Sequence, residues 1–296
     1  MKNVYFFGSS CVDGNFEMSN ILGVKGAYLA ENCSLGIRVP PGFTIPYCAK
    51  SYSLKDPINF IEKETGQKFT NLEEYDIPLL VSVRPDSSSS LSLGAILNIG
   101  INDDVAERLI SLGYEEDFVY GAYSQLIFSL SLTNGVSSDV FEEFHNKNKK
   151  SSSFKELCLS FKNIYLNELG VEFPQDPQDQ LIKSITYFFK SCPSLCAVNI
   201  QQMVFGNIGD NSGSGIANAM IDGDHKGEYL NKSQVYDITS GMFTSEEFDI
   251  YKDYGFSCQL FDYLDIITEH YGANMYIEFV VEDGEVYILK TRKLKR

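Results

Sequence analysis

The spacing of hydrophobic and polar residues divides the chain into three stretches. Before residue 102, apolar residues at helical spacing from Lys25 to Leu35 predict one helix, which ends at Gly36. Short apolar runs in the same stretch predict strands at 4–7, 43–45 and 79–83, the last of which leads into Arg84. From 103 to 190, apolar positions recur at intervals of three and four and predict a block of helices.

Strand-like patterning returns after residue 197. We expect a strand at 197–206, a glycine-rich loop at 206–219, and a C-terminal hairpin of 274–281 with 285–293. The pattern therefore predicts an α/β protein of the α+β kind. We expect an N-terminal lobe at 1–102, an inserted helical subdomain at 103–192 and a C-terminal lobe at 193–296.

Composition narrows the functional classes. The 296 residues include 40 acidic and 24 basic side chains, a net charge of −16, which repels nucleic acid and anionic membranes. No run approaches the roughly 20 apolar residues of a membrane span, and the N-terminus becomes polar too early for a secretory signal. We therefore expect a cytoplasmic protein with no nucleic-acid or membrane partner.

Cysteine and histidine favour neither a zinc site nor a catalytic triad. The seven cysteines are an odd number and are scattered, which indicates reduced thiols. Cys192 and Cys196 are close, but no second pair completes a zinc set. None of the three histidines lies in a Ser/Asp pattern.

Two basic residues are placed to meet an anion. Lys25 lies in the segment Gly23-Val24-Lys25-Gly26 ahead of a helix, where a bare backbone and a helix start favour a phosphate. Arg84, at the end of an expected buried strand, has a fork of donors that suits an oxyanion. The structural alternatives are an ordinary turn for Lys25 and a salt bridge to a helix end for Arg84.

Two further segments could complete a nucleotide site. The expected strand that ends in Met203 and Val204 could offer backbone groups to an adenine edge, although a core strand explains it equally. Glu278 lies between two apolar residues on a strand and is expected to point away from them, toward a cleft or solvent. Mg²⁺ usually takes one or two carboxylates and phosphate oxygens.

Seven motifs follow one another in the order VPPGF, VSVRPDSSSS, FVYGAY, FPQDPQDQL, QQMVFGNIGDNSGSG, GEYL and IEFVVEDGEVYILKTR. Together they resemble the N-terminal nucleotide-binding domain of pyruvate phosphate dikinase, which is shared with phosphoenolpyruvate synthase. The resemblance covers nearly the whole chain. It implies an ATP-grasp-type, two-lobed fold that binds ATP and Mg²⁺ and phosphorylates a histidine on a separate swivelling domain. That domain and the family's barrel domain have no counterpart in this sequence, so catalysis of the family kind would require a histidine-bearing partner in trans.

The resemblance carries site residues over one by one. It assigns the phosphate site and catalysis to Lys25 and Arg84, and one metal-binding carboxylate to Glu278. It assigns the rest of the nucleotide site to Gln202, Met203 and Val204, which form the adenine segment, and to Glu228 of GEYL.

Several positions depart from the family pattern. Tyr276 replaces an acidic residue two positions before Glu278, and Lys290 replaces the glutamine of the closing motif. Arginines are missing from the segments 123–125 and 218–222, and the loop after Arg84 lacks the family's Met-Pro-Gly element. Phosphoryl transfer depends on cations and metals that offset spreading negative charge, so these losses predict severely reduced catalysis. Lys290 could act as a point cation near the phosphates.

Three functions remain open. The first is an ATP-binding domain that is a weakened kinase-like transferase, or pseudoenzyme. The second is an active phosphotransferase that phosphorylates a histidine on a partner chain. The third is an interaction module that binds no nucleotide.

Overall fold

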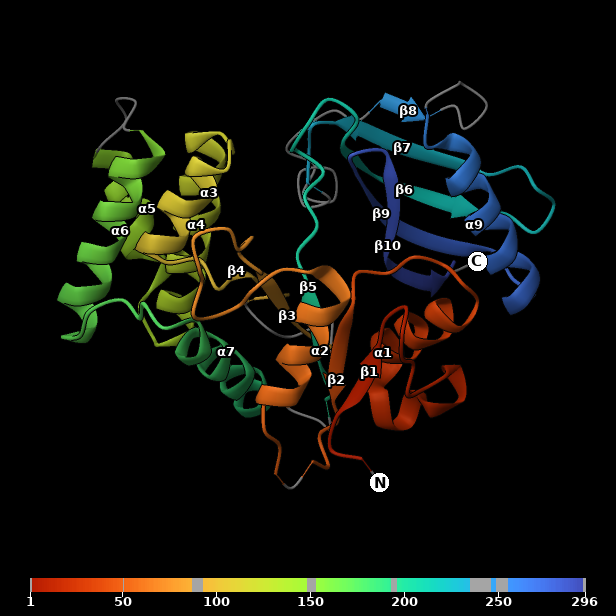
Figure 1. Cartoon of the computed structure of the whole chain (residues 1–296), viewed down its shortest axis with the longest axis horizontal. Helices are drawn as coiled ribbons and strands as arrows, with labels where there is room; N and C mark the ends of the chain where they lie inside the picture. The colour runs from red at the N-terminus through yellow and green to blue at the C-terminus, as the bar shows by residue number, and fades with distance from the viewer. Residues whose placement is uncertain are drawn as a thin grey trace. The chain divides into compact units, whose positions relative to one another are not determined.

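The computed structural model describes residues 2–49, 51–86, 93–147, 153–192, 196–234, 246–248 and 255–294. The chain divides into two compact units (Figure 1). Unit 1 combines residues 1–44 with 204–296, and unit 2 is residues 45–203.

Unit 1 is built around an antiparallel sheet with the strand order β10–β9–β6–β7–β8. Its strands are β6 (Gly213–Ala219), β7 (Lys226–Asn231), β8 (Glu246–Phe248), β9 (Met275–Glu282) and β10 (Glu285–Lys293). Helix α9 (Ser257–Tyr271) lies against one face of this sheet (Figure 1). The buried residues of this interface include Leu260, Leu264 and Ile267 on the helix and Ala217, Ile277 and Phe279 on the strands.

The N-terminal segment supplies the other elements of unit 1. They are β1 (Tyr5–Phe7), a 3-10 turn (Phe16–Met18), α1 (Ser19–Ser34) and β2 (Gly42–Ile45), the last of which ends at the boundary with unit 2. Strands β1 and β2 pair antiparallel. Helix α1 is tied to β10, because Asn32 Nδ2 donates a hydrogen bond of 2.8 Å to Thr291 Oγ1.

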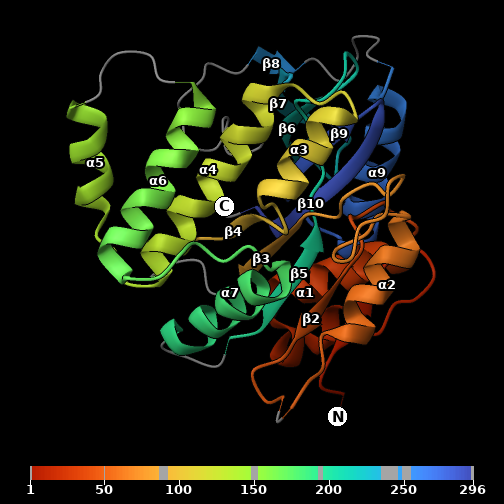
Figure 2. The same cartoon turned by 60° about the vertical axis from the view of Figure 1, so that its left-hand side comes forward.

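Unit 2 contains a short antiparallel sheet and a group of helices. Strand β3 (Val81–Pro85) pairs with β4 (Ile96–Ile99) on one side and β5 (Val198–Gln202) on the other. The helices are α2 (Lys55–Thr65), α3 (Asp103–Ser111), α4 (Glu116–Thr133), α5 (Ser138–Lys147), α6 (Phe154–Leu169) and α7 (Pro177–Ser191). Figure 2 shows α3 to α6 grouped together next to β4.

Local sequence signals explain why the helices of unit 2 begin and end where they do. The Ser153 side chain accepts a hydrogen bond from the Glu156 backbone, and the Glu156 carboxylate accepts one from the Ser153 backbone, which is a capping box. Gly170 ends α6 with a left-handed φ of 70°. Pro177 occupies the first turn of α7, where its missing N–H has no helical acceptor to lose.

The α+β prediction is confirmed, and the helical block runs from α3 to α7 as expected. Strand β3 covers 81–85 instead of 79–83, so Arg84 lies inside it. Within the described ranges, no helix is long and apolar enough to cross a membrane. The cytoplasmic location and the three-part division at 102/103 and 192/193 stay predictions.

The glycine-rich segment 206–219 was expected to be a loop, and this was wrong for its second half. Residues from Gly213 onward form β6 in the middle of the unit 1 sheet. A Cβ on Gly213 would lie 2.2 Å from Tyr229 Oη, and one on Gly215 would lie 2.3 Å from Phe279 Cζ. These glycines therefore allow large aromatic rings to lie over the strand.

Candidate functional site

One face of the unit 1 sheet carries several of the residues expected in a site. The pairing of β6, β7, β9 and β10 places Glu228, Glu278 and Lys290 in one row across the strands. Residues two apart on a strand share a face, so Tyr276 and Arg292 in the next row lie on the same side. This is the face opposite to the one that α9 covers.

Glu278 forms an ion pair with the residue opposite it on β10. Its Oε1 accepts a hydrogen bond of 2.6 Å from Lys290 Nζ and a longer one of 3.4 Å from Tyr276 Oη. Glu278 is only 8% exposed, whereas the Lys290 side chain is 34% exposed. Exposure of Glu278 to solvent was therefore a wrong alternative, and its place in a cleft stays a prediction. Glu278 leaves the α9 side as expected, but it is buried and engaged by a lysine.

A β-bulge produces this pairing. From the turn at Asp283–Gly284, the register is regular as far as Ile288, which lies opposite Phe279. The register then shifts by one residue at Leu289, so Lys290 rather than Leu289 lies opposite Glu278. Without this shift, Lys290 would lie opposite Ile277, on the face that packs against α9.

An apolar patch lies beside the charged pair. Val204, the first residue of the second segment of unit 1, is buried against Val280 and Leu289, with Tyr287 packed at the edge. Val280 is two residues from Glu278 on β9 and therefore shares its face. The bulge thus places an apolar residue, Leu289, and a cation, Lys290, next to each other on one side of the sheet.

Glu282 holds the segment that follows Val204. Its Oε1 accepts a hydrogen bond of 2.8 Å from the backbone N–H of Phe205. Burial raises the pKa of the Glu282 carboxyl above its ordinary value, against the effect of that hydrogen bond. The folded state therefore holds the proton more tightly than the unfolded state does.

We expect a Glu282→Gln variant to lose less stability than the wild type as pH rises. The carboxyl with a raised pKa stabilises the folded state at low pH, and this contribution is lost as pH rises through the raised pKa. Glutamine carries no charge at any pH and keeps an acceptor for Phe205. Urea unfolding of both proteins between about pH 4 and about pH 7 measures the difference. Parallel curves for the two proteins would contradict the assignment to Glu282.

Sequence reasoning missed Arg292, which completes this face. Its guanidinium carbon lies 4.1 Å from the ring centroid of Tyr276, a cation–π contact, and Lys290 Nζ lies 5.8 Å from the same ring. Burial, followed by the Glu278 charge, raises the pKa of Tyr276 to about 12. The phenol therefore stays a neutral donor. Arg292 is two residues from Lys290, as Tyr276 is from Glu278, and this spacing could have indicated that Arg292 lies on the same face of the sheet.

Lys25 lies on α1 shortly after an interruption in that helix. Gly23 has φ 70° and ψ 165°, so the helix that begins at Ser19 breaks there and resumes. The helix therefore starts before the expected position, and the half-buried Lys25 lies in the first turn of its second segment. The sequence context expected for Lys25, a glycine break followed by a helix, is present, and its phosphate-binding role stays a prediction.

Arg84, Gln202 and Met203 belong to unit 2, so they are described apart from the sheet face above. Arg84 is half-buried on β3, opposite Asn199. Gln202 ends β5, and its Nε2 donates a hydrogen bond of 3.2 Å to the side chain of Gln67. The backbone N–H of Met203 bonds Leu80 O at 2.8 Å. Met203 and Val204 therefore follow the strand instead of ending it, and the nucleotide-binding roles of these residues stay predictions.

Comparison with known proteins finds similarity along the whole sequence. The chain is 33% identical over 350 residues to "Pyruvate, phosphate dikinase, chloroplastic" of Mesembryanthemum crystallinum, which covers 100% of this chain and 36% of that protein. It is 30% identical over 341 residues to "Pyruvate, phosphate dikinase" of Clostridium symbiosum, which covers 96% of this chain and 38% of that protein. The chain is a homologue of pyruvate, phosphate dikinases. It matches their N-terminal portion and spans little more than a third of their length. No protein-family model matches it.

The described residues do not fit the Mg²⁺ that homology to pyruvate, phosphate dikinase implies. The carboxylate assigned to the metal, Glu278, is bonded to Lys290, and Tyr276 stands where the resemblance implies a second acid. Among the residues that the structure describes, no group of three or more His, Cys, Asp and Glu side chains could hold a metal ion. We therefore assign no metal-dependent step to this chain.

Two of the positions where the resemblance to the dikinases implies arginines, 124 and 125, lie in the helical block. Ser124 on α4 is buried, and its Oγ donates to Gly121 O within the same helix. The exposed Gln125 accepts a hydrogen bond of 2.9 Å from Asn98 Nδ2. These two positions therefore offer no cation to a phosphoryl group.

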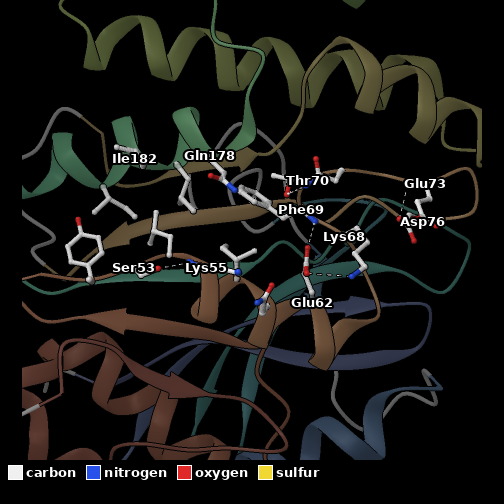
Figure 3. Close-up of a pocket in the computed structure, with 17 residues that line it drawn as sticks. Ser53, Lys55, Glu62, Lys68, Phe69, Thr70, Glu73, Asp76, Gln178 and Ile182 are labelled. Carbon is white, nitrogen blue, oxygen red and sulfur yellow. Dashed lines mark hydrogen bonds and ion pairs between the residues drawn. The ribbon is translucent and has the colours of Figure 1, made fainter.

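A separate pocket of about 920 Å³ lies within unit 2, between α2, α7 and the loop 68–76 (Figure 3). None of the residues predicted for the nucleotide site lines it. Its charged groups are partly engaged with one another. Glu62 accepts a hydrogen bond from the Phe69 backbone and lies 3.6 Å from Lys68 Nζ, and Asp76 accepts one from the Glu73 backbone.

Proposed function

We propose that this chain is an ATP-binding domain with weakened phosphoryl transfer. The observation that carries the proposal is the sheet face of unit 1, where an apolar patch lies beside two cations in a homologue of pyruvate, phosphate dikinases. Apolar surface suits the adenine ring, and cations suit the phosphates. ATP is also the nucleotide that the family resemblance implies.

This face repels an anion less than the chain as a whole does, because Lys290 and Arg292 offset the charges of Glu228 and Glu278. The chain as a whole carries a charge of −16, which repels a triphosphate. Lys290 and Arg292 lie in adjacent rows of one strand, and the Lys290 side chain is partly exposed. Glu278 offsets part of the charge of Lys290, so the exposed Arg292 and the remaining donors of Lys290 are the groups that would meet the phosphates. Glu228, exposed in the same row, is placed to accept a hydrogen bond from a sugar hydroxyl.

Weakened transfer follows from the cations that are missing. A single arginine that contacts the transferred phosphoryl group can change the rate by about 10³–10⁵-fold. Ser124 and Gln125 stand where the resemblance implies arginines, and Glu278 is engaged by Lys290. The alternative is an active phosphotransferase that acts on a histidine-bearing partner. The binding experiment does not test this alternative, so it requires a transfer assay.

We expect wild-type protein to bind ATP in a calorimetric titration and Lys25→Ala to bind it at least about tenfold more weakly. A charge-assisted hydrogen bond to phosphate is worth about 1.5–3 kcal/mol, and 1.4 kcal/mol corresponds to a factor of ten. Lys190→Ala is the matched control, because Lys190 is an exposed lysine in the last turn of α7. This control should bind ATP like the wild type.

Two results would contradict the proposal, one for the role of Lys25 and one for nucleotide binding as a whole. Equal affinity of Lys25→Ala and Lys190→Ala would remove Lys25 from the site. No binding of ATP by the wild type would reject nucleotide binding and favour the interaction module. Radiolabelled ATP incubated with the chain and a histidine-bearing acceptor domain tests transfer, and rapid labelling of the acceptor would show that catalysis is retained.

A further inference from the structure

We infer that Lys290 takes the place of a divalent cation in this chain, so that ATP binds here without Mg²⁺. The inference rests on the proposed function for its ligand, but its statement about the metal can be tested on the protein alone. It starts from the disagreement between the described residues and a Mg²⁺ site.

The first argument is that Glu278 is already engaged. Its Oε1 lies 2.6 Å from Lys290 Nζ, within a strong charge-assisted hydrogen bond, and 3.4 Å from Tyr276 Oη. Mg²⁺ requires oxygen ligands at about 2.0–2.1 Å in octahedral geometry. An ion bound to this oxygen would lie close to the ammonium, and two like charges in a half-buried place repel strongly. A metal on this oxygen therefore competes with the lysine.

The second argument is that the backbone holds Lys290 in this position. The bulge at Leu289 sets Lys290 opposite Glu278, and Thr291, which follows, is fixed to Asn32 of α1 by a hydrogen bond of 2.8 Å. Tyr276 fills the neighbouring position, with Arg292 at 4.1 Å from its ring centroid. The lysine is therefore held from both sides along the strand.

The third argument is that Lys290 retains the means to contact a ligand. An ammonium group has three hydrogen-bond donors, and the bond to Glu278 uses one of them. The side chain is 34% exposed, while Glu278 beneath it is buried. Lys290 can therefore stay bonded to Glu278 and face a phosphate at the same time, as a bridging Mg²⁺ would.

The test is calorimetric titration of the full chain with ATP, once in EDTA and once in Mg²⁺. We expect the wild-type Kd values in the two buffers to agree within about threefold. Tyr276→Asp/Lys290→Gln removes the ammonium and supplies a second carboxylate, so its Kd should fall at least about tenfold when Mg²⁺ is present. Tyr75→Asp/Lys190→Gln makes the same replacements at two exposed positions of unit 2, and should behave like the wild type. A wild-type Kd that Mg²⁺ lowers more than threefold, or a double variant that ignores Mg²⁺, would overturn the inference.

Failure of the proposed function can be distinguished from failure of this inference. If the wild type binds ATP in neither buffer, nucleotide binding is rejected. Mn²⁺ binding to the protein alone then decides whether Lys290 takes the place of a metal ion. Electron paramagnetic resonance should then count the same number of Mn²⁺ ions on the wild type and on Glu278→Gln, and one more on the double variant. A Mn²⁺ site present in the wild type and lost in Glu278→Gln would refute the role of Lys290. If circular dichroism shows Glu278→Gln to be unfolded, the comparison of the wild type with the double variant gives the answer.

Discussion

Phe279→Ala is expected to lower the free energy of unfolding by about 3–5 kcal/mol, the usual cost of removing a buried aromatic ring. Phe279 is fully buried between the sheet and α9. Its ring stacks on Tyr229 with centroids 6.3 Å apart and also contacts Phe256. Gly215 offers no side chain that could move into the space left by the ring. Urea unfolding followed by circular dichroism measures the loss.

The same substitution at an exposed phenylalanine is the control. Phe154, in the first turn of α6, is 44% exposed, so Phe154→Ala should cost much less than Phe279→Ala. Equal shifts of the two unfolding midpoints would mean that the α9 interface is not the core of unit 1. Tryptophan fluorescence is not an option as a probe, because the chain contains no tryptophan.

Gly206→Ala is expected to destabilise the protein by about 3 kcal/mol or more, at the upper end of the cost of overpacking. A Cβ on Gly206 would lie 2.3 Å from Ser233 O and 2.4 Å from Gly213 O. Both neighbours are backbone carbonyls, so neither can rotate away as a side chain would. The variant should also bind ATP more weakly, because a backbone shift at Gly206 would displace Val204 from the apolar patch. Unfolding in urea and ATP titration measure the two effects.

Gly255→Ala is the matched control for this substitution. A Cβ at Gly255 meets no described atom within 4 Å, and its φ lies outside the left-handed region. We expect no loss of stability from this change, because alanine fits the site and restricts the unfolded chain. A normal unfolding midpoint for Gly206→Ala would show that the segment 204–213 can shift without cost.

The helical block was predicted correctly, because the signals that bound its helices lie between neighbouring residues. The capping box of Ser153 and Glu156, the glycine at the end of α6 and Pro177 at the start of α7 act within one turn of helix. The helical block could therefore be delimited from the sequence alone. The C-terminal hairpin was also predicted, because its turn residues lie between two strand-like runs.

The features that the sequence did not predict depend on residues far apart. Gly213 and Gly215 are typical loop residues in the sequence. In the structure they lie on a strand, where the rings of Tyr229 and Phe279 leave no room for a side chain. The alternation of side chains along a strand predicts the face on which Glu278 lies. It does not predict that Glu278 is buried, because burial depends on the neighbouring strands. Its pairing with Lys290 depends on the bulge, since the regular register from the turn would place Leu289 opposite Glu278. No local pattern marks that bulge.

The bulge at Leu289 has a consequence for how such a binding face can change during evolution. A single inserted residue usually turns every following side chain of a strand to the other face. A bulge absorbs the extra residue, so the pairs on both sides keep their partners: Ile288 stays opposite Phe279, and Lys290 stays opposite Glu278. Leu289 is the unpaired residue of the bulge, and it contacts Val204 while the neighbouring pairs are retained. An insertion at this place can alter what the face binds while leaving the hairpin that carries it intact.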